Sequence, residues 1–97
     1  MVSLDFILNW LESIMFASVY RSNKKEDMYL YLRVKDDFTV VPEALLKVFG
    51  KPEFALQINL AKRDKLSRVN IEQVKLQLET EGFFLQLPPT NNFNISN

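Results

Sequence analysis

Four short segments in which apolar and polar residues alternate constrain this chain most, because a period of two is the pattern of a half-buried β-strand. They cover residues 15–21, 28–34, 54–60 and 83–87. Two stretches with helical spacing separate the later segments, and each ends at one of the chain's two glycines. The sequence therefore predicts strands and helices that alternate along the second half of the chain.

The first two alternating segments surround the polar residues 22–27, which predicts an antiparallel hairpin. The second segment places four apolar residues on one face: Met28, Leu30, Leu32 and Val34. The third segment predicts Phe54, Leu56, Ile58 and Leu60 inward and Gln57 outward. In the fourth, Phe84 and Gln86 share the less apolar face, with Gln86 as the counterpart of Gln57. Pro88 and Pro89 then end strand pairing.

Both helical stretches carry start and stop signals. Pro42 suits the first turn of a helix within residues 41–50, and Gly50 can end that helix. Asn70 is a good N-cap for the second helix, and Gly82 ends it. Its buried stripe is expected to comprise Ile71, Val74 and Leu78, with Leu76 alongside.

The order strand-strand-helix-strand-helix-strand predicts an α+β fold. We expect a two-layer sandwich, in which a mixed four-stranded sheet has its helices mainly on one face. The length of 97 residues predicts a single domain, over residues 15–89, followed by a flexible polar tail at 90–97. For residues 1–14 two interpretations stay open: a short amphipathic helix, or an appendage to the domain.

Composition excludes several chemistries. The chain has no cysteine and no histidine, which excludes disulfides, thiolate zinc sites and the commonest general base. We therefore expect no cofactor and no metal. Twelve basic residues balance twelve acidic ones, so attraction to nucleic acid or lipid would have to be local. No segment has the roughly 18–20 apolar residues of a membrane span, and no secretory signal pattern is present, which favours the cytoplasm.

Two small polar groups are candidates for a metal site and for a nucleophile, but a structural role suits both better. Asp36 and Asp37 are adjacent carboxylates, but they lack calcium-loop spacing and fit a turn. Ser22 would need a deprotonated lysine as its base, and Lys24 and Lys25 lie in a loop with acidic neighbours that favour charged lysine.

Two basic loops are the better candidates for binding a macromolecule. The hairpin loop, residues 21–25, and the segment 62–68 could contact phosphates. The candidate residues are Arg21, Lys24, Lys25, Lys62, Arg63, Lys65 and Arg68. Charged loops of this kind are also common in proteins that bind no nucleic acid.

Four segments, in this order and at this spacing, resemble one family: "MFASVYRSNKK", "YLYLRVKDDF", "VPEALLKVFG" and "GFFLQLPP". They resemble the YcgL domain family of small bacterial proteins over residues 15–89. The resemblance implies a compact α/β fold and no known activity. Ala17 stands where relatives often have cysteine, and Asn70 stands where aspartate is common. The family tends to begin near Met15, which favours the appendage interpretation of residues 1–14.

The leading functional hypothesis is therefore a small non-enzymatic domain that binds another protein. An RNA-binding accessory factor that uses the two basic loops is the second hypothesis, and an enzyme of unknown type is the third.

Overall fold

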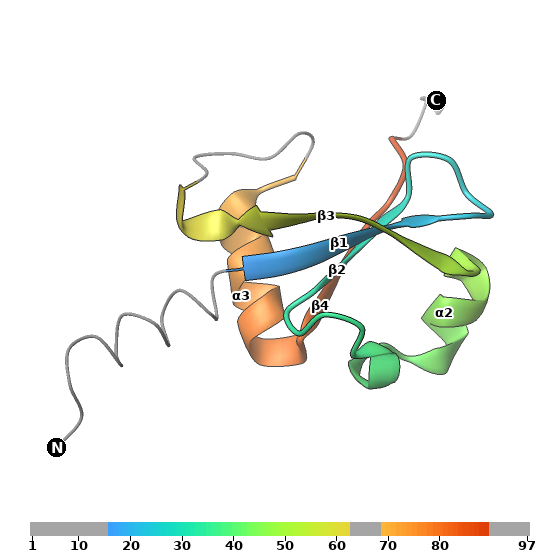
Figure 1. Cartoon of the computed structure of the whole chain (residues 1–97), viewed down its shortest axis with the longest axis horizontal. Coiled ribbons are helices and arrows are strands. Elements are labelled where there is room, and N and C mark those ends of the chain that lie inside the picture. Colours follow the sequence, from blue (N-terminus) through green and yellow to red (C-terminus); the bar gives the residue numbers. More distant parts are fainter. Residues whose placement is uncertain (1–15, 63–68, 90–97) are drawn as a thin grey trace, which may run out of the picture.

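The predicted hairpin is present at the centre of the fold (Figure 1). The computed structural model describes residues 16–62 and 69–89 of the chain. β1 (Phe16–Ser22) and β2 (Tyr29–Leu32) pair antiparallel. Because β2 ends at Leu32, Val34 lies beyond the strand and is exposed, contrary to its predicted place on the buried face.

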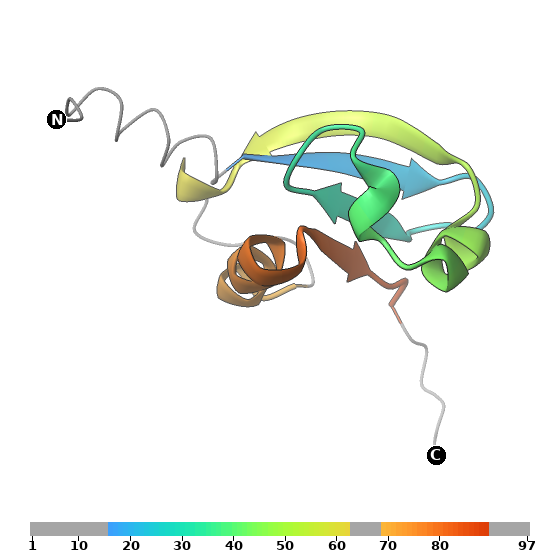
Figure 2. The same ribbon diagram turned by 90° about the horizontal axis from the view of Figure 1, so that it is seen from below.

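β3 (Pro52–Asn59) and β4 (Phe83–Gln86) complete a four-stranded sheet in the order β3-β1-β2-β4. All three pairings are antiparallel, and the strand arrows alternate in direction across the sheet in Figure 2. The α+β class and the order of elements are confirmed, but the mixed sheet is wrong. β2 and β3 run parallel to each other, as expected of a helical crossover, yet β1 lies between them and pairs with both.

α2 (Glu43–Phe49) connects β2 to β3, after a short 3₁₀ helix, η1 (Phe38–Val40). Pro42 is the N-cap of α2, one position before its first residue. Gly50 ends the helix, and its amide donates a hydrogen bond to the carbonyl of Leu46 at 2.9 Å. The predicted glycine stop is confirmed.

α3 (Ile71–Glu81) connects β3 to β4 and follows a second 3₁₀ turn, η2 (Leu60–Lys62). The side-chain oxygen of Asn70 accepts hydrogen bonds from the amides of Glu72 (2.9 Å) and Gln73 (3.1 Å), so the predicted N-cap is confirmed. Gly82 ends α3 in the left-handed conformation, at φ +88°, which glycine adopts without steric cost.

α3 covers one face of the sheet. Its buried side chains pack against alternate residues of β1 and against β2 and β3. This first core contains Ala17, Val19, Tyr31, Ile58, Leu60, Ile71, Val74 and Leu78. The predicted stripe of Ile71, Val74 and Leu78 is confirmed, whereas Leu76 is exposed.

A second core lies on the opposite face, because successive strand residues point to opposite sides of a sheet. It contains Tyr20, Met28, Leu30, Leu32, Val41, Phe49 and Phe83. The end of α2 packs here, toward the other end of the sheet from α3 (Figure 1). The prediction of helices mainly on one face is therefore wrong: β1 and β2 are buried on both sides and lie between two layers.

A β-bulge in β3 changes which of its side chains face each core. Val19 of β1 pairs with Leu56, but the next residue, Tyr20, pairs with Phe54, so one residue of β3 is left over. Phe54 and Leu56 consequently lie on opposite faces, and each is 45% exposed. Leu56, opposite Val19, keeps the face of Ile58 as predicted but is not buried. The prediction that Phe54 shares this face is wrong, because the additional residue resets the alternation.

Gln86 is buried on the α3 side of the sheet. It shares this face with Phe84, as predicted, and its side-chain oxygen accepts a hydrogen bond from the Tyr31 hydroxyl at 2.7 Å. Gln57 of β3 is exposed, so the predicted equivalence of the two glutamines is wrong. Gln86 is a polar core residue with a partner.

The short helix or appendage predicted at residues 1–14 and the polar tail at residues 90–97 lie outside the described residues. No helix in the ranges 16–62 and 69–89 has the length and apolar content needed to span a membrane.

Candidate functional site

Asp36 and Asp37 form the turn that their sequence predicts. The Asp37 carboxylate caps η1 by accepting a hydrogen bond from the amide of Thr39 at 3.3 Å. The Asp36 carboxylate accepts a hydrogen bond from the Tyr20 hydroxyl at 2.8 Å, and that hydroxyl accepts one from the Asp36 amide at 2.7 Å. Across the described ranges, no group of three or more metal-ligating side chains comes together.

Ser22 is a structural residue of the hairpin loop. Its hydroxyl donates a hydrogen bond to the carbonyl of Phe49 and accepts bonds from the amides of Lys24 (3.0 Å) and Lys25 (2.9 Å). The Lys24 ammonium donates to the carbonyl of Lys47 at 3.1 Å, near the C-terminal end of α2, where a positive charge is favourable. The group of Lys24 that reaches the Ser22 hydroxyl is therefore its backbone amide, while its side chain is directed to α2, which does not suit the role of base for a serine nucleophile.

The seven basic candidates have different surroundings. Arg21 forms an exposed ion pair with Glu53 at 3.5 Å, and the Lys24 side chain is bound to α2. Lys25 is exposed in the same loop. Lys62 ends η2, and Arg63, Lys65 and Arg68 lie outside the described residues. Arg21, Lys24 and Lys25 thus belong to one hairpin, but the side chains of Arg21 and Lys24 are engaged with β3 and α2 respectively. The RNA interface stays a prediction.

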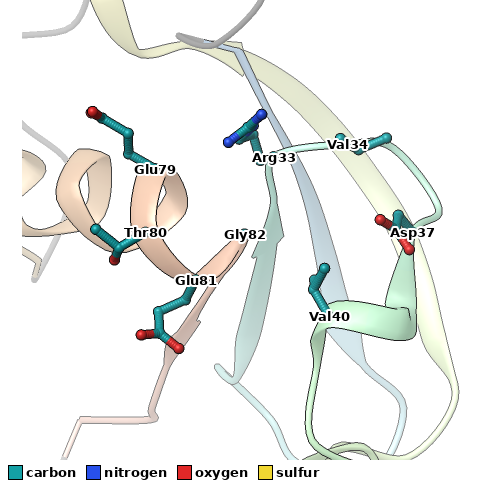
Figure 3. A pocket seen from close by; sticks show the side chains of 8 residues that line it. All are labelled: Arg33, Val34, Asp37, Val40, Glu79, Thr80, Glu81 and Gly82. Atoms are coloured by element: carbon teal, nitrogen blue, oxygen red, sulfur yellow. The ribbon is translucent and has the colours of Figure 1, made fainter.

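A hollow of about 270 Å³, which no sequence pattern predicted, lies where the end of α3 meets the segment after β2. Figure 3 shows that its lining comes from two sides: Glu79, Thr80, Glu81 and Gly82 from α3 and its end, and Arg33, Val34, Asp37 and Val40 from the segment after β2. Residues far apart in the sequence thus build one concave site.

The backbone fixes the two sides of this hollow relative to each other. The amide of Arg33 donates a hydrogen bond to the carbonyl of Gly82 at 3.0 Å, which ties the end of β2 to the end of α3. A Cβ atom on Gly82 would lie 3.3 Å from the side chain of Val40, closer than an ordinary van der Waals contact. Glycine at this position therefore both ends α3 and lets η1 approach it.

A second hollow, of about 440 Å³, continues along the exposed face of α3. It is lined by Gln73, Leu76, Gln77, Thr80 and Glu81, so it shares Thr80 and Glu81 with the first. We call the two adjoining hollows the α3 groove.

The α3 groove exposes three aliphatic side chains. Leu76 is 62% exposed, Val34 is 55% exposed and Val40 is 38% exposed. Val34 and Val40 line the first hollow, and Leu76 lines the second. Exposed apolar groups in polar-rimmed hollows are typical of binding sites, whereas scattered ones are ordinary. Sequence patterns did not reveal these exposed groups, because alternation placed Val34 with the buried residues of its strand and Leu76 was expected beside the buried stripe of α3.

The ionised side chains of the groove are mostly acidic. Asp37, Glu79 and Glu81 line it together with Arg33. In the described part of the chain, neither Glu79 nor Glu81 forms an ion pair, and Arg33 forms none either. The groove thus combines three aliphatic side chains with polar ones, among which carboxylates outnumber cations.

Comparison with known proteins shows the family of this chain. A family model described as "YcgL domain" matches residues 17–89. The chain belongs to the YcgL domain family. The resemblance stated from the four sequence segments is therefore confirmed, and the matched range contains every residue of the α3 groove.

Curated YcgL relatives are similar over most of their length. A YcgL domain-containing protein of Vibrio vulnificus is 55% identical over 75 residues, which cover 77% of this chain and 80% of the relative. One from Vibrio atlanticus is 53% identical over 77% of each chain, and one from Proteus mirabilis is 48% identical over the same shares. These names describe the YcgL domain and state no activity.

Proposed function

We propose that this YcgL domain is a non-enzymatic module that binds another protein through the α3 groove. The observation that carries the proposal is the group of three exposed aliphatic side chains, Leu76, Val34 and Val40, in two adjoining hollows. Burying such groups removes apolar surface from water at about 25 cal/mol per Å², which is a major driving force for protein association.

The polar groups of the groove also favour binding over catalysis. The Thr80 hydroxyl donates a hydrogen bond to the carbonyl of Leu76 at 3.0 Å within α3, so it is already engaged. The remaining polar side chains are carboxylates, glutamine amides and one guanidinium. The lining shows no pair of nucleophile and base within hydrogen-bond reach, the arrangement that nucleophilic catalysis requires.

The proposal includes a cytoplasmic location. A chain without cysteine is compatible with a reducing compartment, because its fold needs no disulfide.

Photo-crosslinking in cells tests the proposal. The photoreactive residue benzoylphenylalanine replaces Leu76 in the groove or, as the matched control, Val48, which is a 50% exposed aliphatic residue on α2 outside the groove. We expect a discrete protein adduct from position 76 that survives nuclease treatment and no adduct from position 48. Adducts to nucleic acid from a probe at Lys25, with none from position 76, would favour the RNA hypothesis instead.

A further inference from the structure

We infer that the occupant of the α3 groove is a short segment of a partner protein in which a lysine or arginine adjoins bulky apolar residues. This inference rests on the proposed function, and it adds the chemical class of the partner.

Charge complementarity is the first argument. Three carboxylates, from Asp37, Glu79 and Glu81, line the first hollow against a single guanidinium from Arg33. Figure 3 shows Glu79 and Glu81 on α3 and Asp37 on the opposite side, with the carboxylates of Glu79 and Glu81 directed away from Asp37. The excess of carboxylates around the hollow attracts a cationic segment, whereas an anionic segment would find only Arg33 as a counter-charge.

The position of two of these carboxylates strengthens the argument. Glu79 and Glu81 lie in the last turn of α3, where the helix dipole is negative, and that turn contains no basic residue. Carboxylates at this end of a helix are unfavourable. They form no ion pair among the described residues. A cationic partner would relieve this repulsion, which an apolar partner could not do.

The apolar lining explains why the occupant is not a simple cation. Lysine and arginine bury their aliphatic stems along apolar surface while the charged group stays in water or beside polar groups. Val40 and Val34 offer such a surface beside the acidic groups. Leu76 lies in the adjoining hollow, which shares Glu81 with the first. An apolar side chain next to the partner's lysine or arginine can pack against Leu76 there.

Selection of peptides on the intact chain tests the partner's chemistry. A phage-displayed library of random twelve-residue peptides is panned on the immobilised full-length protein. We expect enriched peptides with lysine or arginine next to leucine, valine, isoleucine or phenylalanine. Glu81→Lys should weaken their binding at least tenfold. Glu26→Lys, the same charge reversal on the exposed hairpin loop, should not weaken it.

The variant Leu76→Glu distinguishes a wrong assignment of the partner's chemistry from a wrong assignment of the groove as a binding site. Peptides that depend on Leu76 but are acidic, or indifferent to Glu81→Lys, would overturn the partner's chemistry and leave the groove in place. Peptides indifferent to both substitutions, or no enrichment at all, would overturn the proposed function itself.

A second copy of the chain is the competing occupant, because residues 61–69 include four basic residues and Leu66. A synthetic peptide with that sequence should bind no tighter than a scrambled version. Tight binding of this peptide, together with concentration-dependent dimers in sedimentation, would replace the foreign partner by self-association.

Discussion

Tyr20 joins three separate segments of the chain through a single side chain. Its hydroxyl both donates to and accepts from Asp36, whose backbone has a left-handed φ of +65°. Its ring makes edge contacts with Phe38, at a centroid distance of 5.0 Å, and with Phe54, at 5.6 Å. The Asp36–Asp37 turn is therefore held by hydrogen bonds and aromatic packing, which accounts for its sequence without a catalytic role.

Stability at high pH should depend on Tyr20. Burial, followed by the hydrogen bond to Asp36, raises the pKa of Tyr20 from 10.0 to about 12. Because the folded-state pKa is the higher one, the stabilisation is fully present below pH 10 and is lost as pH rises toward 12. We expect the free energy of unfolding of the wild type to fall more steeply over this window than that of Tyr20→Phe.

Urea denaturation of both proteins at several pH values gives this difference directly, since other titrating groups are common to both. Parallel curves for wild type and Tyr20→Phe between pH 10 and 12 would contradict the assignment.

Ser22→Ala should destabilise the fold by about 1–2 kcal/mol, because three backbone groups around the hairpin loop lose a hydrogen-bond partner. Ser22→Thr keeps the hydroxyl and is the control, with a smaller expected loss. Denaturant titrations measure both. Unchanged stability in the alanine variant would show that the hydroxyl does not hold the loop.

At the scale of elements, local sequence patterns predicted the existence and type of the helices and strands well. They predicted less well on which face of the sheet a side chain lies. Both caps of α3 follow from Asn70 and Gly82, because capping depends on one residue and its immediate neighbours. The facing of Phe54 did not follow, since a β-bulge is set by pairing with a distant strand. Val34 was misplaced for a similar reason: pairing, not alternation, ends β2 at Leu32.

The pairing of β4 with β2 makes a prediction for Gln86 and Tyr31. Removing either partner, in Gln86→Leu or Tyr31→Phe, removes this buried hydrogen bond and should cost about 1–3 kcal/mol. The double variant replaces both partners by apolar groups, so we expect it to lose clearly less than the two single losses combined. Additive losses in denaturant titrations would show that the two side chains do not interact.

At the scale of the whole molecule, the antiparallel order β3-β1-β2-β4 creates the candidate site. Pairing β4 with β2 brings Gly82 to Arg33, and the α3 groove forms where these ends meet. No local pattern contains this information, because residues 33–40 and 73–82 meet only through the sheet order. The family was recognisable from four sequence segments, but the groove needed the topology.

The claim that this YcgL domain binds a protein through its groove is tested most directly by affinity purification of the tagged chain. Three forms are compared with and without nuclease: wild type, Leu76→Glu, and Val48→Glu as an equally polar change outside the groove. We predict a protein partner that survives nuclease, is lost with Leu76→Glu and is kept with Val48→Glu. Partners that all disappear on nuclease treatment, or that Leu76→Glu retains in full, would contradict the account.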